Sequence, residues 1–130
     1  MDAGSRPALG IGVDVISVEE VRHSLARFGH RYLDRIVGEA PESAPDPRVL
    51  AGRFAVKEAV AKALDVGDAP LPWSAIEVEA YPSGRARVRL NGPAARLADE
   101  RGLEGIEAGV RVDSREARAI AVARYAPRVP

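Results

Sequence analysis

The stretch Leu9–Ile16 (LGIGVDVI) constrains the fold more than any other part of this 130-residue chain. Its β-branched residues form an apolar run with the length of a buried strand. The Gly10-x-Gly12 pair lacks the third glycine and the following helix of a dinucleotide-binding loop. One charged residue, Asp14, lies inside the run. Because a lone carboxylate is costly to bury, we expect Asp14 to be paired or to bind a metal ion.

The composition describes an ordinary globular chain with the length of one domain. Hydrophobic residues make up 46% and charged residues 29%, which argues against wholesale disorder. The 19 basic and 19 acidic residues cancel, so we expect no nucleic-acid partner. No apolar run reaches the roughly 20 residues that span a bilayer, so we expect no membrane association. The absence of cysteine excludes disulfides and thiolate metal sites and fits a cytoplasmic location.

The order of apolar patterns predicts an α+β domain over residues 8–126, after a disordered N-terminus at residues 1–7. We expect a mostly antiparallel sheet packed against one long helix, which lacks proline and is rich in alanine. Four helices are expected. The first begins at the Ser17-x-x-Glu20 capping pair and ends near Phe28, and a short second helix follows Gly29. The other two are Arg48–Leu64 and Pro93–Arg101. The expected later strands are Trp73–Tyr81, Arg85–Leu90, Ile106–Val112 and Ala119–Tyr125. A proline-rich loop is expected at residues 38–47.

The only two lysines, Lys57 and Lys62, both lie in the long helix of a chain otherwise dominated by arginine. Arginine stays charged at any ordinary pH, whereas a lysine amine can be tuned to give or take a proton. Glu58 and Lys62 are four residues apart, so they project from one helix face, and Arg53 and Lys57 form a similar pair. The same spacing also describes a solvated helix face with one Glu–Lys pair.

Asp14 favours a chemical role for this helix face. A strand aspartate and a helix glutamate, here Glu58, can share a hard divalent cation whose other ligands are water and phosphate oxygens. A lysine nearby, here Lys62, can then stabilise phosphoryl charge or relay a proton. The residues therefore indicate Mg²⁺-dependent phosphoryl chemistry.

The sequence resembles the holo-acyl-carrier-protein synthases, which are 4′-phosphopantetheinyl transferases. The segments that carry the resemblance follow the family's order from about Leu9 to Tyr125: GIGVDVISVEEV, RFGHRYLDRI, LAGRFAVKEAVAKAL, LPWSAIEVEAYPSGRARVRLNGPA and AIAVARY. The resemblance implies transfer of the phosphopantetheine arm of coenzyme A to a carrier-protein serine, with release of adenosine 3′,5′-bisphosphate. It implies that Asp14 and Glu58 bind Mg²⁺, and that Lys62 and Glu58 are catalytic.

The resemblance also implies partners for the remaining basic residues. Coenzyme A would be bound by Arg53, Lys57 and Lys62 and by the turn Ser83-Gly84-Arg85. The acyl carrier protein is acidic, and arginines would steer its approach. Basic residues that recur every four positions form a stripe that offers such a surface: His23, Arg27, Arg31 and Arg35. An exposed amphipathic helix would show the same pattern without binding a partner. The family further implies a homotrimer with sites between subunits.

Three positions depart from the family's pattern, which suggests a diverged member. Asp65 stands where glycine is common, and Asp113 and Ser114 stand where serine and histidine are expected before the last strand. Acidic groups repel nucleotide phosphates, so the nucleotide end of the site is expected to be altered. The alternative is a catalytically impaired relative that binds a carrier protein or coenzyme A as an interaction module. An RNA-binding domain built on RARVRLNG is disfavoured by the zero net charge and few aromatic residues.

Overall fold

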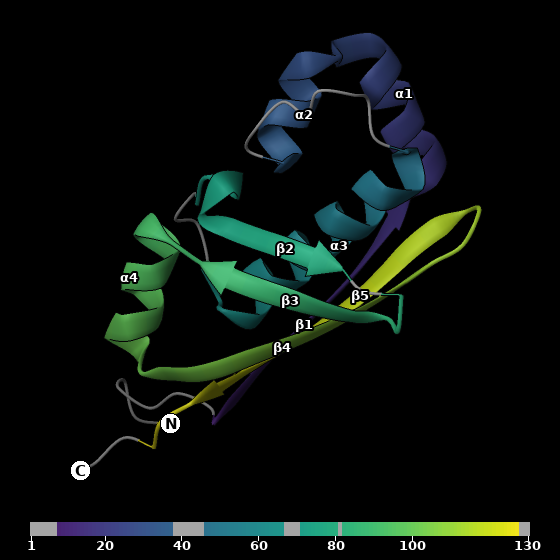
Figure 1. Cartoon of the computed structure of the whole chain (residues 1–130). Coiled ribbons are helices and arrows are strands. Elements are labelled where there is room, and N and C mark those ends of the chain that lie inside the picture. The colour runs from purple at the N-terminus through teal and green to yellow at the C-terminus, as the bar shows by residue number, and fades with distance from the viewer. Residues whose placement is uncertain (1–7, 38–45, 67–70, 81, 128–130) are drawn as a thin grey trace.

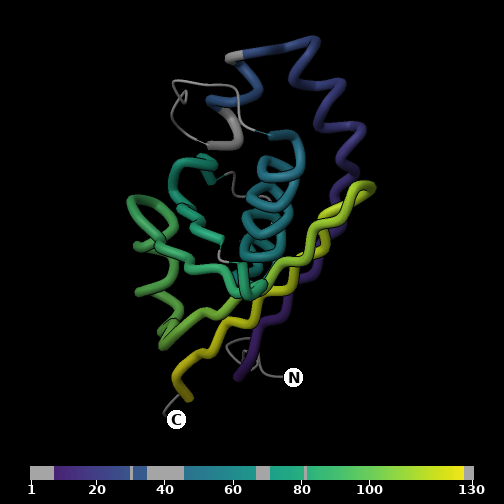
Figure 2. The backbone as a smooth tube through the Cα atoms, turned by 45° about the vertical axis from the view of Figure 1, so that its right-hand side comes forward, coloured from purple at the N-terminus to yellow at the C-terminus, as the bar shows by residue number. Residues whose placement is uncertain are grey.

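The computed structural model describes residues 8–37, 46–66, 71–80 and 82–127, and its centre is a five-stranded sheet. The strand order is β1-β5-β4-β3-β2, and every neighbouring pair is antiparallel. The strands are β1 (Leu9–Ser17), β2 (Ile76–Ala80), β3 (Arg85–Leu90), β4 (Leu103–Val112) and β5 (Glu116–Tyr125). Figures 1 and 2 show β1 and β5 running side by side along the sheet. The expected α+β class with an antiparallel sheet is confirmed.

The helices are α1 (Val18–Phe28), α2 (His30–Val37), α3 (Pro47–Ala63) and α4 (Gly92–Arg101). The long helix α3 lies against one face of the sheet, whereas α1 and α2 form a pair at one end of the molecule (Figure 1). The predicted cap of α1 is present, since the Ser17 hydroxyl accepts the Glu20 N–H at 3.2 Å. None of the described helices is long and apolar enough to cross a membrane.

The expectation of a strand from Trp73 was wrong for its first three residues, because Trp73–Ala75 forms a 3₁₀ turn, η1. The Trp73 ring packs edge-on against Phe54 at 5.5 Å, and its carbonyl accepts a hydrogen bond from Lys57. These tertiary contacts override the alternating pattern. Tyr81 lies outside the described residues, as do residues 1–7, expected to be disordered, and residues 38–45 of the expected loop.

Small residues let β1 approach α3 unusually closely. A Cβ at Gly12 would lie 1.9 Å from the Ala59 carbonyl oxygen, and one at Gly10 would lie 2.1 Å from the Ala63 carbonyl oxygen. Only glycine fits at either position. This close approach brings the inward side of β1, which also carries Asp14, against α3.

The outward side of β1 carries large apolar side chains that stay exposed. Leu9, Ile11, Val13 and Val15 are 49–63% exposed, and Ile120 of the neighbouring strand β5 is 48% exposed. Val13 pairs directly with Ile120 in the sheet, so these side chains form one continuous patch. We call this patch the outer apolar face.

Candidate active site

Asp14 and Lys62, distant in sequence, meet where β1 passes over α3. Lys62 Nζ lies 2.9 Å from Asp14 Oδ1 and donates a second hydrogen bond to the Val13 carbonyl at 3.0 Å. The Asp14 side chain is only 17% exposed, whereas that of Lys62 is 53% exposed. The carboxylate in the apolar strand is therefore paired, as its burial requires.

The second oxygen of Asp14 has capacity for another partner. Asp14 Oδ2 is buried and has no hydrogen-bond partner among the described residues. Such an atom costs free energy unless a donor or a cation reaches it. Glu58 lies one helical turn before Lys62 on α3 and is half-buried. Carboxylates are the ligand type that Mg²⁺ prefers, since this ion is commonly held by one or two protein carboxylates with phosphate and water.

The described residues contain no group of three or more His, Cys, Asp or Glu side chains that could hold a metal ion. An ion held by only two carboxylates keeps coordination positions for a phosphate substrate. This donor set suits a metal that acts together with a phosphorylated substrate.

Glu58 also lines a cavity of about 510 Å³ among α1, α2 and α3. Its walls are largely aromatic and come from Phe28, Tyr32, Phe54 and Trp73. Burial raises the pKa of the Tyr32 hydroxyl. Glu58 therefore shares this hollow, which we call the aromatic cavity, with four aromatic side chains.

A second cavity, of about 540 Å³, brings Arg53 and Gly84 together between the start of α3 and the β2–β3 turn. Arg48 and Arg111 also line it, and the sequence analysis did not identify either of them. They come from different elements, α3 and β4, so no sequence spacing connects them. Asp46 lines the same cavity and forms an ion pair with Arg48 at 3.1 Å, whereas no ion pair is seen for Arg53 or Arg111 among the described residues. We call this hollow the arginine cavity, and its net positive charge suits an anionic ligand.

Ser83 and Arg85 do not line the cavity that holds Arg53. Together with Gly84 they line a separate hollow of about 460 Å³, where Arg111 and Arg118 are also found. The predicted turn is thus divided, because only Gly84 contributes to both hollows.

Lys57 is the one predicted coenzyme A contact whose side chain is buried. Its side chain is buried, with 3% exposed, and its ammonium donates to the Trp73 carbonyl at 2.9 Å. Burial, with the charge of Arg53, lowers the pKa of Lys57 to about 8. Lys57 lines none of the three cavities described above, and its hydrogen bond instead connects α3 to η1.

The departures from the family's pattern have local structural explanations. Asp65 has a φ of 50°, a left-handed conformation in which glycine is favoured. Asp113 Oδ1 accepts the N–H groups of Arg115 and Glu116 at 2.8 and 2.9 Å, which lowers the pKa of its carboxyl. The Asp113 carboxylate therefore closes the β4–β5 turn and does not line the arginine cavity. Ser114 is exposed in the same turn.

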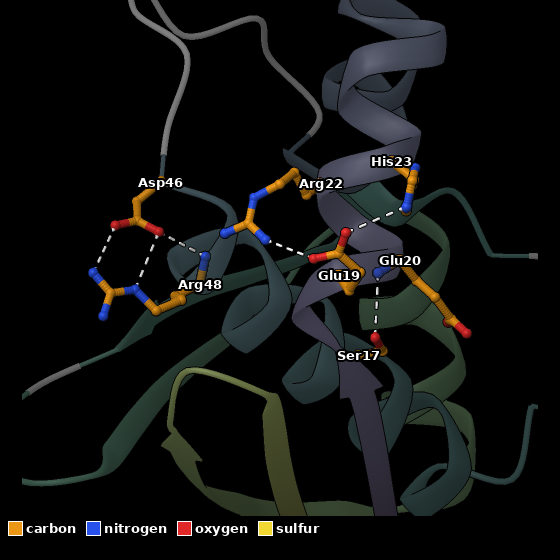
Figure 3. Close-up of polar contacts among 7 residues, drawn as sticks. All are labelled: Ser17, Glu19, Glu20, Arg22, His23, Asp46 and Arg48. Carbon is orange, nitrogen blue, oxygen red and sulfur yellow. Dashed lines mark hydrogen bonds and ion pairs between the residues drawn. The ribbon is translucent and has the colours of Figure 1, made fainter.

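The predicted basic stripe is divided at Gly29, where the chain turns from α1 into α2. His23 lies 3.3 Å from Glu19, which also pairs with Arg22 at 2.7 Å (Figure 3). The Arg27 guanidinium lies 5.4 Å from the centre of the Phe28 ring. Arg27 and Arg31 are exposed on either side of the turn, while the Arg35 side chain lies outside the described part.

Known proteins are similar to this chain in both sequence and fold. The family model of the 4′-phosphopantetheinyl transferase superfamily matches residues 10–123. The holo-acyl-carrier-protein synthase of Desulforudis audaxviator is 38% identical over 120 residues, which are 88% of this chain and 92% of that protein. The crystal structure of the Neisseria meningitidis synthase matches with a TM-score of 0.75 at 27% identity, over 88% of this chain and 97% of that one.

The synthase of Helicobacter pylori, determined in complex with coenzyme A, matches with a TM-score of 0.72 at 26% identity. The match covers 87% of this chain and 98% of that chain. The likeness thus extends over nearly the whole length of both proteins. The chain therefore belongs to the holo-acyl-carrier-protein synthase family of the 4′-phosphopantetheinyl transferase superfamily.

Proposed function

We propose that this protein transfers the 4′-phosphopantetheine arm of coenzyme A to a serine of an acyl carrier protein. The reaction depends on Mg²⁺ and releases adenosine 3′,5′-bisphosphate. The observation that carries the proposal is the contact between Asp14 and Lys62, one helical turn from Glu58. A pair of carboxylates beside a lysine suits transfer of a phosphoryl group.

Asp14 and Glu58 would hold the Mg²⁺ ion, which when bound neutralises negative charge on the pyrophosphate of coenzyme A. Lys62 stabilises the charge that develops on the phosphoryl oxygens as the bond to the leaving group breaks. Glu58 lines the aromatic cavity, and its carboxylate there can accept the proton of the attacking serine. Lys62 and Glu58 are therefore the catalytic residues of the proposal.

The arginine cavity is the proposed site for the nucleotide part of coenzyme A. Arg53 supplies positive charge, and Gly84 allows the backbone of the β2–β3 turn to approach a ligand. Arg48 and Arg111 add two further guanidinium groups. Ser83 and Arg85 remain proposed contacts on the other side of the turn. Lys57 acts through Trp73 in this account and not on a phosphate.

The carrier protein is proposed to approach the turn between α1 and α2. Arg27 and Arg31 are exposed there, and Arg31 also lines the aromatic cavity beside Glu58. Complementary charge at such a rim increases the association rate more than the lifetime of the complex. The serine of an acidic carrier would thus be guided to the catalytic carboxylate.

We further propose that the protein forms a homotrimer through its outer apolar face. Single protein chains rarely expose a contiguous patch of large apolar side chains. The face combines Leu9, Ile11, Val13 and Val15 of β1 with Ile120 of β5. Burying it between copies would remove these side chains from water. We also propose that the protein is located in the cytoplasm.

The interaction-module alternative depended on Asp113 and Ser114 in place of serine and histidine. The Asp113 carboxylate is held in the β4–β5 turn by two backbone N–H groups and stays negatively charged there. Calorimetry separates the two functions. The transferase predicts coenzyme A binding that strengthens with Mg²⁺, whereas carrier binding without coenzyme A binding would contradict it.

A further inference from the structure

The ammonium of Lys62 occupies the accessible side of the Asp14 carboxylate. Its Nζ lies 2.9 Å from Oδ1 and 3.0 Å from the Val13 carbonyl oxygen. The other oxygen, Oδ2, is buried. A cation bound by either oxygen of Asp14 would therefore lie close to the Lys62 ammonium.

We propose that Lys62 competes with the divalent cation for Asp14, so that metal binding displaces Lys62 and frees its ammonium for the phosphate. The inference rests on the metal site of the proposed function. Two cations at one carboxylate repel each other, so a metal ion on Asp14 disfavours the ion pair between Lys62 and Oδ1. One carboxylate thus couples metal loading to the availability of the catalytic lysine.

The surroundings of Lys62 allow this movement. Its side chain is 53% exposed, so it can turn into solvent without leaving a cavity in the core. The other lysine, Lys57, is buried and is fixed by its bond to the Trp73 carbonyl. Once released from Asp14, Lys62 still shares a helix face with Glu58. The freed ammonium therefore remains beside the proposed metal site.

Binding of Mn²⁺ in the absence of coenzyme A, followed by the electron paramagnetic resonance of the free ion, tests the competition. Lys62→Met should bind Mn²⁺ about tenfold more tightly than the wild type, the gain expected if the ion pair is formed about nine-tenths of the time. Arg118→Met is the matched control, because it removes one positive charge from β5 at a side chain that forms an ion pair with Glu116. It should leave the affinity nearly unchanged, and Asp14→Asn should weaken binding strongly in either background.

Amine labelling of the wild type tests the same idea without a substitution. The chain has two lysines, so acetylation followed by peptide mass spectrometry reports each of them separately. Saturating Mg²⁺ should increase the labelling of Lys62 several-fold and leave the buried Lys57 unlabelled. Metal binding with constant labelling of Lys62 and unchanged affinity in Lys62→Met overturns this inference alone. Failure of Mn²⁺ to bind even with coenzyme A present overturns the metal site of the proposed function and the inference with it.

Discussion

Replacement of Gly12 by alanine should separate β1 from α3 and lower the stability of the protein sharply. The new Cβ would lie 1.9 Å from the Ala59 carbonyl oxygen and 2.8 Å from the Ala63 backbone nitrogen. Ordinary contact begins near 3.4 Å, so strand and helix must move apart by more than an ångström. Overpacking of this kind costs about 3 kcal/mol when the backbone itself is the obstacle. For a chain of this size, that loss lowers the melting temperature by about 10 °C.

Urea unfolding followed by circular dichroism measures the loss, with all variants compared at one protein concentration. Gly105→Ala is the matched control, because its Cβ would meet the far end of the flexible Arg124 side chain, which can move away. We expect that control to stay within about 1 kcal/mol of the wild type. Gly12→Ala should also break the Asp14–Lys62 pair, since Asp14 follows two residues later on the same strand face. Equal stability of the two alanine variants would refute the close approach.

Three further predictions concern single residues. The pKa of Lys57 is lowered from 10.5 to about 8 in the folded protein. Between these pH values the unfolded chain binds more protons than the folded chain. The free energy of unfolding should therefore rise as the pH increases from about 8 to 10.5. The rise is on the order of 3 kcal/mol and should be absent in Lys57→Met. Urea unfolding at several pH values measures it, and a wild-type free energy of unfolding that does not change with pH would contradict the prediction. Asp65→Gly should raise stability by about 1 kcal/mol in thermal unfolding, because glycine suits the positive φ, and a loss would oppose this reasoning. Arg27→Glu combined with Arg31→Glu should raise KM for the carrier at low salt with kcat little changed, and an unaltered KM would exclude the docking surface.

Local signals explain how much of the fold was predictable. The cap at Ser17, the long alanine-rich helix and the later strands each depend on neighbouring residues, and all of these elements formed. Trp73–Ala75 did not follow its pattern, because contacts with Phe54 and Lys57 determine its conformation. An alternating pattern contains no information on such distant partners.

The pairing of Asp14 was predictable from the sequence, whereas the arrangement of the residues around it was predictable only in part. Asp14 was correctly expected to be paired, but its partner depends on how closely β1 lies to α3. The pairs Arg53–Lys57 and Glu58–Lys62 have the same spacing in sequence, yet Lys57 is buried and Lys62 is exposed. Spacing on a helix defines which residues share a face and not which element covers that face.

The most direct test of the account is the mass of a carrier protein after incubation with this protein, coenzyme A and Mg²⁺. The account predicts that an apo-carrier gains one phosphopantetheine group at its serine. Lys62→Ala should slow this gain strongly while circular dichroism shows an intact fold. Removal of Mg²⁺ by a chelator should stop the gain. If no carrier encoded near the gene gains mass under these conditions, the proposed transferase activity is contradicted.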